Sequence, residues 1–446
     1  MKNERPPRPD DAMVWSTIRK EPDDTAVEAV WASLSDRLET TPQLAPRIIT
    51  WPWSPALPGV SRRSPRIGGR AVTTFATVAL VALVVLIAAV AVVTIGRRVP
   101  PPFGLAAPGL IAFDDGGDVV VVDQDGTRRR ELTSGPAVDV RPTWSLDGRM
   151  IAYWSVPRGE TVARLMVMDA DGSHPRIAGT KELGFDVSGR PVVDWFDIAW
   201  SPDGRFLAFT GGVIGRPQVG IARADGSGSS LIGDPDLLGQ TPAWSPDGTK
   251  LAFRGGRADR ERGVYVMAAD GTDIVRVTTP EQLGDGGTFS YFLPTWSPDG
   301  TRILYSKMVG EQHPAAAGPF SAYRIIVVDV VSGIETPLSD DQAYNDYPVW
   351  SPDGSRVAYM QWKGTDPSYS VVIGADGSNR TTLPIPGWNS LHWSPDGQAV
   401  IADATDVSAG IVVSSLAGRT MLTIPLTSTV PTAFGAGAAS WQRLAP

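Results

Sequence analysis

Cysteine is absent from this sequence of 446 residues, and histidine occurs only three times. The chain therefore has no disulfide, thiol nucleophile, iron–sulfur cluster or cysteine-bound zinc. An excess of basic charge is also missing, because 40 Lys and Arg face 48 Asp and Glu, a net charge of −8. Nucleic-acid binders carry a basic footprint, so we expect no nucleic-acid partner. Because the three histidines are scattered, the sequence predicts no metal ion and no cofactor.

One stretch has no charged residue at all. The 26 residues between Arg70 and Arg97 are mostly Ala, Val, Leu and Ile. As a helix they would extend about 39 Å, enough to cross a hydrocarbon core of about 30 Å. A cleaved signal peptide is the alternative, but its apolar region would be shorter and would begin near the N-terminus. The sequence predicts an uncleaved transmembrane helix over 71–96.

The flanks of this stretch predict its orientation. Four arginines precede it within ten residues, whereas only Arg97 and Arg98 follow it before Arg128. Basic residues are retained on the cytoplasmic side of a membrane. We therefore expect a single-pass protein of the cell membrane, with residues 1–70 in the cytoplasm and everything after a linker (97–108) outside it.

The N-terminal arm, 1–70, contains one predicted amphipathic helix at about 25–39, followed by a Pro/Arg-rich linker. Thr25 and Glu28 have the spacing of a capping box, and apolar residues including Trp31 and Leu34 then recur at helical spacing. So short a segment cannot bury that stripe alone, so a cytoplasmic protein binding at 11–40 is a predicted partner. The layout resembles that of membrane-bound anti-sigma factors, which makes transmembrane signalling an alternative function.

A repeated pentapeptide organises the rest of the chain. One Trp-Ser-Leu-Asp-Gly and five Trp-Ser-Pro-Asp-Gly copies recur at spacings of 43 to 56 residues. Each is followed by a short apolar strand, then a second strand with an Ala-Asp-Gly type of turn, then a third strand. The repeat tryptophans, predicted to be structural residues between neighbouring units, are Trp144, Trp200, Trp244, Trp296, Trp350, Trp393 and, without the full motif, Trp441.

Counting strands gives seven units of four, each ending on one of these tryptophans. This period and strand number are typical of β-propeller blades. We predict an all-β propeller over 109–446 with seven blades; six blades is the alternative. Proline presets a turn conformation and glycine accepts a positive φ, so the Ser-Pro-Asp-Gly segments should be tight turns between strands.

The Trp-Ser-Pro-Asp-Gly repeat, followed by strands such as Leu-Ala-Phe, closely resembles the repeats of TolB-like propellers. The resemblance covers about three quarters of the chain, from residue 105 onward, and implies a propeller fold. TolB itself is a soluble periplasmic protein with six blades and a separate N-terminal α/β domain. This chain has a predicted membrane span instead, so the partners of that family are not carried over.

The connections on one face of the predicted propeller are uniformly tight, and the long insertions lie on the other face. Insertions on one face of a repeat protein often mark its binding face. A mixture of aromatic, basic and acidic groups there suits a protein or glycan ligand at the cell envelope. The predicted ligand-binding residues are Arg141, Arg190, Trp195, Asp197, Arg257, Arg260, Tyr291, Phe292, Asp346, Tyr347 and Trp388.

An enzyme is not predicted. The chain has no Gly-x-Ser-x-Gly nucleophile elbow and no length left for a hydrolase domain after Trp441. His392 is read as an ordinary strand residue before Trp393. A hydrolase with a site in the propeller channel is the last alternative, because Asp139, Asp197 and Asp346 start strands that a propeller brings together around its channel. The main prediction is a non-enzymatic binding or sensing module outside the cytoplasm.

Overall fold

The fold is that of a computed structural model. It describes residues 105–185, 191–192, 197–213, 215–257, 260–279, 293–308, 323–340, 343–363, 368–383, 385, 391–403, 410–427 and 439–444. The predicted arm and transmembrane helix lie outside these residues. Within them, no helix has the length and apolar character needed to span a bilayer.

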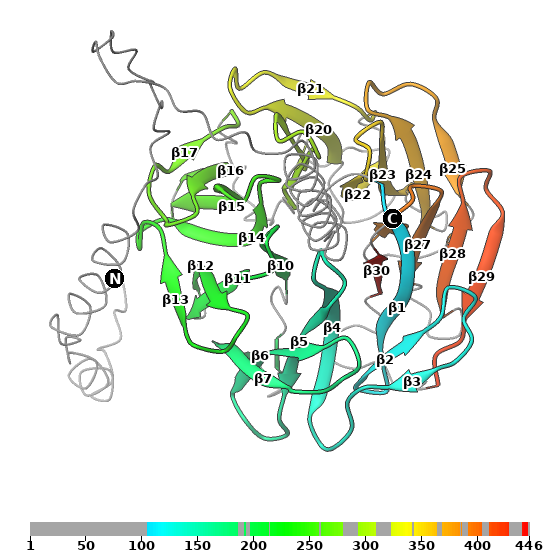
Figure 1. Ribbon diagram of the computed structural model, residues 1–446. Helices are drawn as coiled ribbons and strands as arrows, with labels where there is room; N and C mark the ends of the chain where they lie inside the picture. The colour runs from blue at the N-terminus through cyan, green and yellow to red at the C-terminus, as the bar shows by residue number, and fades with distance from the viewer. Residues whose placement is uncertain are drawn as a thin grey trace, which may run out of the picture. The chain divides into compact units, whose positions relative to one another are not determined.

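Seven four-stranded antiparallel sheets are arranged around a common centre, as Figure 1 shows. Blades 1 to 4, each given from its outer or inner edge in bonding order, are β3 (Arg130–Glu131), β2 (Asp118–Val122), β1 (Ala107–Asp115) and β30 (Ser440–Leu444); β4 (Val138–Trp144), β5 (Met150–Val156), β6 (Val162–Asp169) and β7 (Arg176–Glu182); β10 (Ile198–Trp200), β11 (Phe206–Val213), β12 (Arg216–Arg223) and β13 (Ser229–Ile232); β14 (Leu238–Trp244), β15 (Lys250–Arg257), β16 (Arg260–Ala268) and β17 (Val275–Arg276).

Blades 5 to 7 continue the same order, from inner to outer strand. They are β18 (Thr295–Trp296), β19 (Arg302–Met308), β20 (Tyr323–Asp329) and β21 (Glu335–Pro337); β22 (Tyr344–Trp350), β23 (Arg356–Trp362), β24 (Tyr369–Gly374) and β25 (Thr381–Leu383); β26 (Leu391–Trp393), β27 (Ala399–Asp403), β28 (Ile411–Ser415) and β29 (Thr420–Ile424). A small hairpin of β8 (Gly184–Phe185) and β9 (Pro191–Val192) lies between blades 2 and 3 in the chain.

The ring closes inside blade 1, where the C-terminal strand β30 pairs antiparallel with β1 and places Trp441 opposite Ile111. Three strands from the start of the propeller and one from its end thus make one sheet. The prediction of seven blades is confirmed, and the alternative of six is wrong. The repeat in the sequence is offset from the blade, since each tryptophan strand is the inner strand of the next sheet rather than the last strand of its own unit.

Each Ser-Pro-Asp-Gly segment is a turn held by its own side chains. In blade 3, Ser201 Oγ donates to Asp203 Oδ1 (2.6 Å) and accepts from the N–H of Phe206 (2.9 Å). The N–H of Gly204 donates to Ser201 O, and Gly204 has a φ of 69°. That left-handed conformation favours glycine, which explains why the sequence repeats it. Equivalent Ser–Asp bonds occur in the other five copies.

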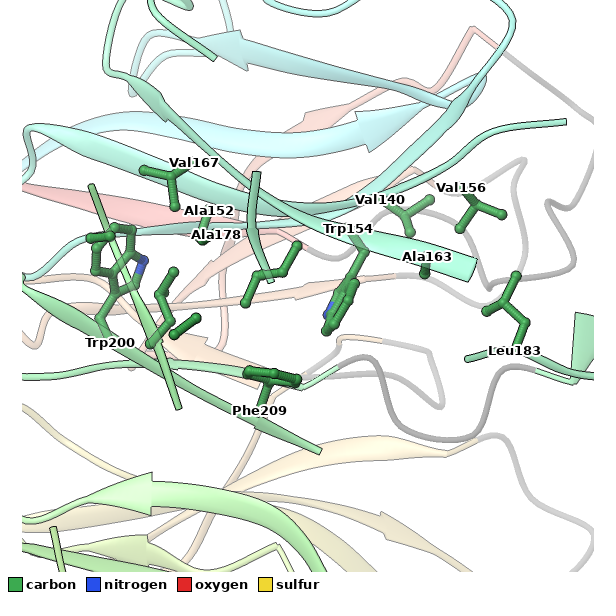
Figure 2. Packing of buried hydrophobic residues seen from close by; sticks show 14 residues of the cluster. Val140, Ala152, Trp154, Val156, Ala163, Val167, Ala178, Leu183, Trp200 and Phe209 are labelled. Carbon is green, nitrogen blue, oxygen red and sulfur yellow. The ribbon is translucent and has the colours of Figure 1, made fainter. Parts of the chain in front are cut away.

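The hydrophobic core is divided among the interfaces between neighbouring blades. Between blades 2 and 3, Trp154 meets Phe209 edge to face, with ring centroids 5.8 Å apart, and Trp200 lies at the other end of the same cluster (Figure 2). Both Trp154 and Phe209 are almost fully buried. Apolar side chains on each sheet thus cover the sheet of the next blade, which fixes the inner strands around the channel.

Five repeat tryptophans also make the hydrogen bond that their indole N–H requires. Each Nε1 donates to the carbonyl of the residue before the tryptophan of the preceding blade, at 3.0 to 3.3 Å; the pairs are Trp200 with Thr143, Trp244 with Ala199, Trp296 with Ala243, Trp350 with Thr295, and Trp393 with Val349. The two tryptophans that border blade 1, Trp144 and Trp441, have no partner for Nε1 within the described part of the chain.

Candidate functional site

The inner strands are irregular at the end opposite the tryptophan, which we call the channel rim. Arg141, Thr241 and Tyr347 each lie three residues before a repeat tryptophan, precede a proline, and have φ values of 50 to 56°. At each of them the pairing with the next strand shifts by a bulge. A left-handed conformation at a non-glycine residue is unfavourable, so neighbouring groups must hold it in place.

Side chains on the second strand of the preceding blade supply that support. The N–H of Arg141 donates to Asp114 Oδ1 (3.1 Å), and the N–H of Thr241 donates to Thr210 Oγ1 (2.9 Å). Both acceptors are nearly fully buried. The chain thus uses a different polar side chain at each interface to fix the same backbone bulge.

Arg141, Asp197 and His392 form the candidate site on this rim. They come from the inner strands of blades 2, 3 and 7, and Arg141 and His392 are both exposed to the channel. The positive charge of Arg141 lowers the pKa of both Asp197 and His392. Blade 1, which stands between blades 7 and 2, contributes only the small residues Ala439 and Ser440 at this level. The guanidinium is therefore near both titratable groups.

Asp197 has one occupied and one unoccupied carboxylate oxygen. Its Oδ2 accepts a hydrogen bond from Thr210 Oγ1 (3.0 Å). Its Oδ1 is buried and has no hydrogen-bond partner among the described residues. Burial raises the pKa of Asp197 above the ordinary 3.8, although the charges of Lys181 and Arg141 and the bond from Thr210 oppose this. A buried carboxylate with an unsatisfied oxygen is an acceptor for a donor on a ligand.

His392 is the site residue that the sequence did not predict. Burial by the channel wall, together with the charge of Arg141, lowers its pKa to about 4. The side chain is reached from the channel, but the surrounding protein replaces most of the water that would solvate its charged form. Its imidazole is therefore neutral at neutral pH. The signal was present in the sequence, since the residues before the other repeat tryptophans are Thr143, Ala199, Ala243, Thr295, Val349 and Ser440, none of them titratable.

The other two carboxylates proposed for a channel site are held apart from Asp197. Asp346 is fully buried in blade 6, where Oδ1 accepts from Ser306 Oγ (2.7 Å) and the N–H of Tyr347 (2.8 Å), and Oδ2 from Tyr344 (2.9 Å). Burial raises its pKa to about 6. Asp139 lies in blade 2, beside Asp118. In the part of the chain with described side chains, no three carboxylate or imidazole groups converge as a metal site.

The remaining predicted ligand-binding residues are divided. Arg257 ends β15 and forms an ion pair with Asp234 (3.0 Å), and Tyr347 is half-buried on the rim. The backbone of Arg260 pairs with Arg257, while its side chain lies outside the described atoms. Outside the described residues altogether are Arg190, Trp195, Tyr291, Phe292 and Trp388.

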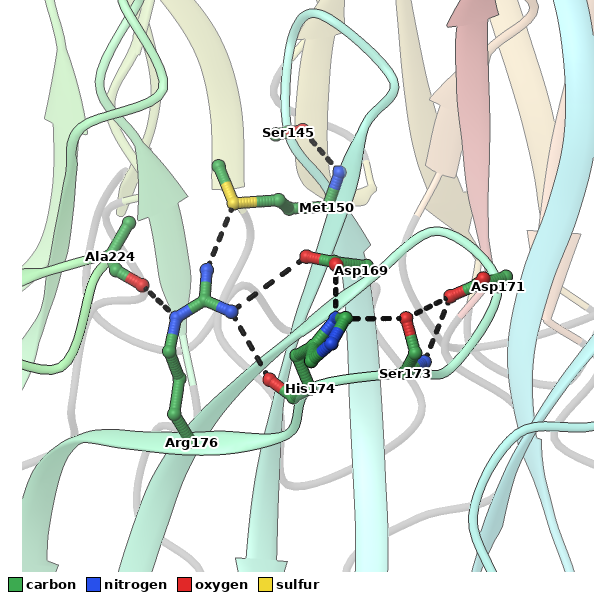
Figure 3. A network of polar contacts seen from close by, with 8 residues as sticks. All are labelled: Ser145, Met150, Asp169, Asp171, Ser173, His174, Arg176 and Ala224. Atoms are coloured by element: carbon green, nitrogen blue, oxygen red, sulfur yellow. Dashed lines mark hydrogen bonds and ion pairs between the residues drawn. The ribbon is translucent and has the colours of Figure 1, made fainter.

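A second polar cluster lies at the turn end of blade 2 and connects it to blade 3 (Figure 3). Arg176 Nε donates to Ala224 O (2.7 Å), Nη1 donates to His174 O (3.1 Å), and Asp169 accepts from His174 Nδ1 (2.8 Å). His174 and Asp169 are well exposed to solvent. These contacts satisfy a turn and join two blades, so this cluster is structural.

Comparison with known proteins begins with a negative result, since no protein-family model matches the chain. A curated relative, the uncharacterized peptidase YuxL of Bacillus subtilis (strain 168), is 27% identical over 138 residues, which are 30% of this chain and 18% of that protein. The chain thus spans less than a fifth of this relative.

Solved structures share the fold. Oligogalacturonate lyase from Vibrio parahaemolyticus has a TM-score of 0.50 at 13% identity, over 74% of this chain and 88% of that one. TolB from Acinetobacter baumannii has a TM-score of 0.47 at 18% identity, over 75% and 82% of the two chains. The prediction that this chain is not an enzyme is wrong on these comparisons, because the proteins it resembles include a peptidase and a lyase. The chain is thus a seven-bladed propeller similar to enzymes as well as to TolB.

Proposed function

We propose that the chain is a hydrolase that acts on peptides at the channel rim, with Arg141, Asp197 and His392 as its working groups. The observation that carries the proposal is the position of the Arg141 guanidinium, which shifts the pKa of a neutral imidazole on one side and of a buried carboxyl on the other. Oppositely tuned titratable groups in one concave place are typical of acid–base catalysis. The peptidase name of the curated relative supports the choice of peptides.

Each group has a role in attack on a peptide carbonyl. His392, neutral because its pKa is about 4, takes a proton from a water molecule, and the resulting hydroxide attacks the carbonyl carbon. Arg141 stabilises the negative charge that develops on the carbonyl oxygen. Asp197, whose raised pKa keeps a fraction of it protonated, donates its proton to the leaving amine as the C–N bond breaks. The imidazolium and the carboxylate then exchange a proton through water, which restores both groups.

We also propose that this activity is presented outside the cytoplasm by the segment 71–96. Its support is the sequence alone: a long uncharged stretch with more arginines before it than after it. The lack of native cysteine permits a direct test. Single variants Ser16→Cys and Ser227→Cys are expressed in intact cells and treated with a membrane-impermeant thiol reagent. Labelling of the 227 variant alone supports the orientation, whereas labelling of the 16 variant alone would reverse it.

The hydrolase proposal is tested with the full chain in detergent micelles and a library of internally quenched peptides. We expect cleavage by the native chain, and loss of at least 100-fold in kcat/KM for Asp197→Asn and for His392→Gln. Matched controls are Asp236→Asn and His174→Gln, which change exposed residues away from the channel and should retain full activity. Equal activity in all four variants, or no cleavage by the native chain, would reject the proposal.

A further inference from the structure

A pocket of about 380 Å³ lies between blades 6 and 7, at the turn end of the propeller and away from the channel rim. Its lining includes Arg356, Val372, Asn379, Thr381 and Leu416. This volume is within the range of small-molecule sites. The neighbouring interfaces are built from the same repeat, so the reason for a pocket at this one can be found by comparing equivalent positions.

The equivalent place between blades 2 and 3 is filled by Arg176, as Figure 3 shows. Counted from the turn glycines, Arg176 and Thr381 both lie four residues after Gly172 and Gly377. Arg176 reaches across the interface to Ala224 O (2.7 Å) and contacts Met150 Sδ (3.2 Å). Thr381 is too short to cross, so the space that a guanidinium occupies between blades 2 and 3 is open between blades 6 and 7.

The charge of the place is also inverted. Asp169, which accompanies Arg176 at 3.8 Å, is replaced in blade 6 by Gly374. Met150 is replaced by Arg356, which forms no ion pair with any described residue. The nearest acid, Asp353, is already hydrogen-bonded by Ser351 and Ser355. The pocket therefore offers an arginine without an acidic residue in its lining.

The rest of the lining is apolar with one amide. Val372 belongs to the core between blades 6 and 7, and Leu416 packs against the same core. Asn379, held at a φ of 54°, adds an amide at the edge. An apolar wall with a few convergent polar groups is the usual composition of a small-molecule site, and an arginine fork pairs best with a carboxylate.

We propose that this pocket binds a small organic carboxylate, with its apolar body against Val372 and Leu416 and its carboxylate on Arg356. The carboxylate belongs either to a free acid or to the C-terminal residue of a peptide, and both present the same chemistry. The site is separate from the proposed hydrolase site, so its occupancy does not depend on that activity.

The test measures benzoate binding to the full chain in micelles by isothermal titration calorimetry, with benzamide as the uncharged analogue and N-acetylleucine as the mimic of a C-terminal residue. We expect saturable benzoate binding and at least tenfold weaker benzamide binding. Tighter binding of N-acetylleucine than of benzoate would assign the peptide source, and the reverse the free acid. Undetectable benzoate binding, or equal affinity for benzamide, would overturn the proposal.

Two variants and one control locate the binding. Thr381→Arg rebuilds the filler found between blades 2 and 3 and should abolish benzoate binding; Thr381→Met, which fills the pocket without charge, serves the same purpose if the arginine variant does not fold. Arg356→Gln should weaken binding at least tenfold. Arg176→Thr opens the matched place beside Asp169 and should create no additional benzoate site. Benzoate affinity unchanged in the folded filler variant would place the binding elsewhere and contradict the proposal.

Discussion

The two ends of the inner strands are built in opposite ways. At the turn end, each copy has the same tryptophan, the same Ser–Asp bond and the same left-handed glycine. At the channel rim, the residue three positions before the tryptophan differs from blade to blade; it is Arg141, Asp197, Thr241, Leu293, Tyr347, Ser390 and Ala438 in the seven blades that begin with blade 2. The turn end carries repeated stabilising contacts, whereas the rim carries buried polar groups of unequal kind, which are costly unless they have a use.

This comparison predicts that single changes at the turn end act on stability and changes at the rim act on function. The expected effects on the free energy of unfolding are taken here from the largest to the smallest. All are measured by urea unfolding of the full chain in micelles, followed by tryptophan fluorescence.

Trp200→Ala should have the largest effect, a loss of about 3–5 kcal/mol, because it empties part of a buried interface and removes a hydrogen bond to Thr143. Trp441→Ala is the matched variant at the closing blade. Trp441 is half-buried and its indole N–H is unpartnered among the described residues, so its loss should be smaller. Equal losses would show that the closing interface is built like the others.

Asp346→Asn should change the pH dependence of stability. The folded chain holds a proton on Asp346 up to a pKa of about 6, while the unfolded chain releases it near 3.8. The stabilisation is therefore present below pH 3.8 and is lost as the pH rises through 6. Between pH 4 and pH 7 the Asn variant should gain roughly 1–3 kcal/mol relative to the native chain. A pH-independent difference would mean that Asp346 titrates at its ordinary pKa.

Asp203→Ala removes the acceptor for Ser201 Oγ and for the N–H of Arg205 in one turn. We expect a loss of about 1–2 kcal/mol, since exposed turn bonds contribute modestly. Cleavage of peptides per folded molecule should stay at the native level. A drop in that rate would break the assignment of turn end and rim to separate tasks.

Arg141→Gln should have the smallest effect on stability, within about 0.5 kcal/mol, because its side chain is exposed and its supporting contact uses the backbone N–H. Its effect on kcat/KM for peptides should be at least tenfold. In the native chain kcat/KM should fall as the pH drops through about 4, where His392 gains a proton. A destabilised but fully active variant would invert the comparison.

The repeat made the fold predictable, and its interruptions limited the prediction of the site. Trp and Gly at fixed spacing require a particular interface and a particular turn, so seven blades could be counted from the amino-acid sequence alone. Arg141 and Asp197 stood out because they depart from the repeat on its rim. His392 did not, because a lone histidine in a strand carries no sign of burial or of a neighbouring charge. The pocket beside Arg356 depends on Thr381 being shorter than Arg176, a difference that has meaning only once the two positions are known to be equivalent.

The central claim is that Arg141, Asp197 and His392 share one electrostatic site on the channel rim. It is tested most directly by titrating the imidazole of His392 by NMR, which is feasible because the chain has three histidines and His392→Gln assigns the signal. We predict a pKa of about 4 in the native chain and a higher value in Arg141→Gln, where the neighbouring charge is removed. A pKa near 6.5 in the native chain, or one that Arg141→Gln leaves unchanged, would contradict the claim.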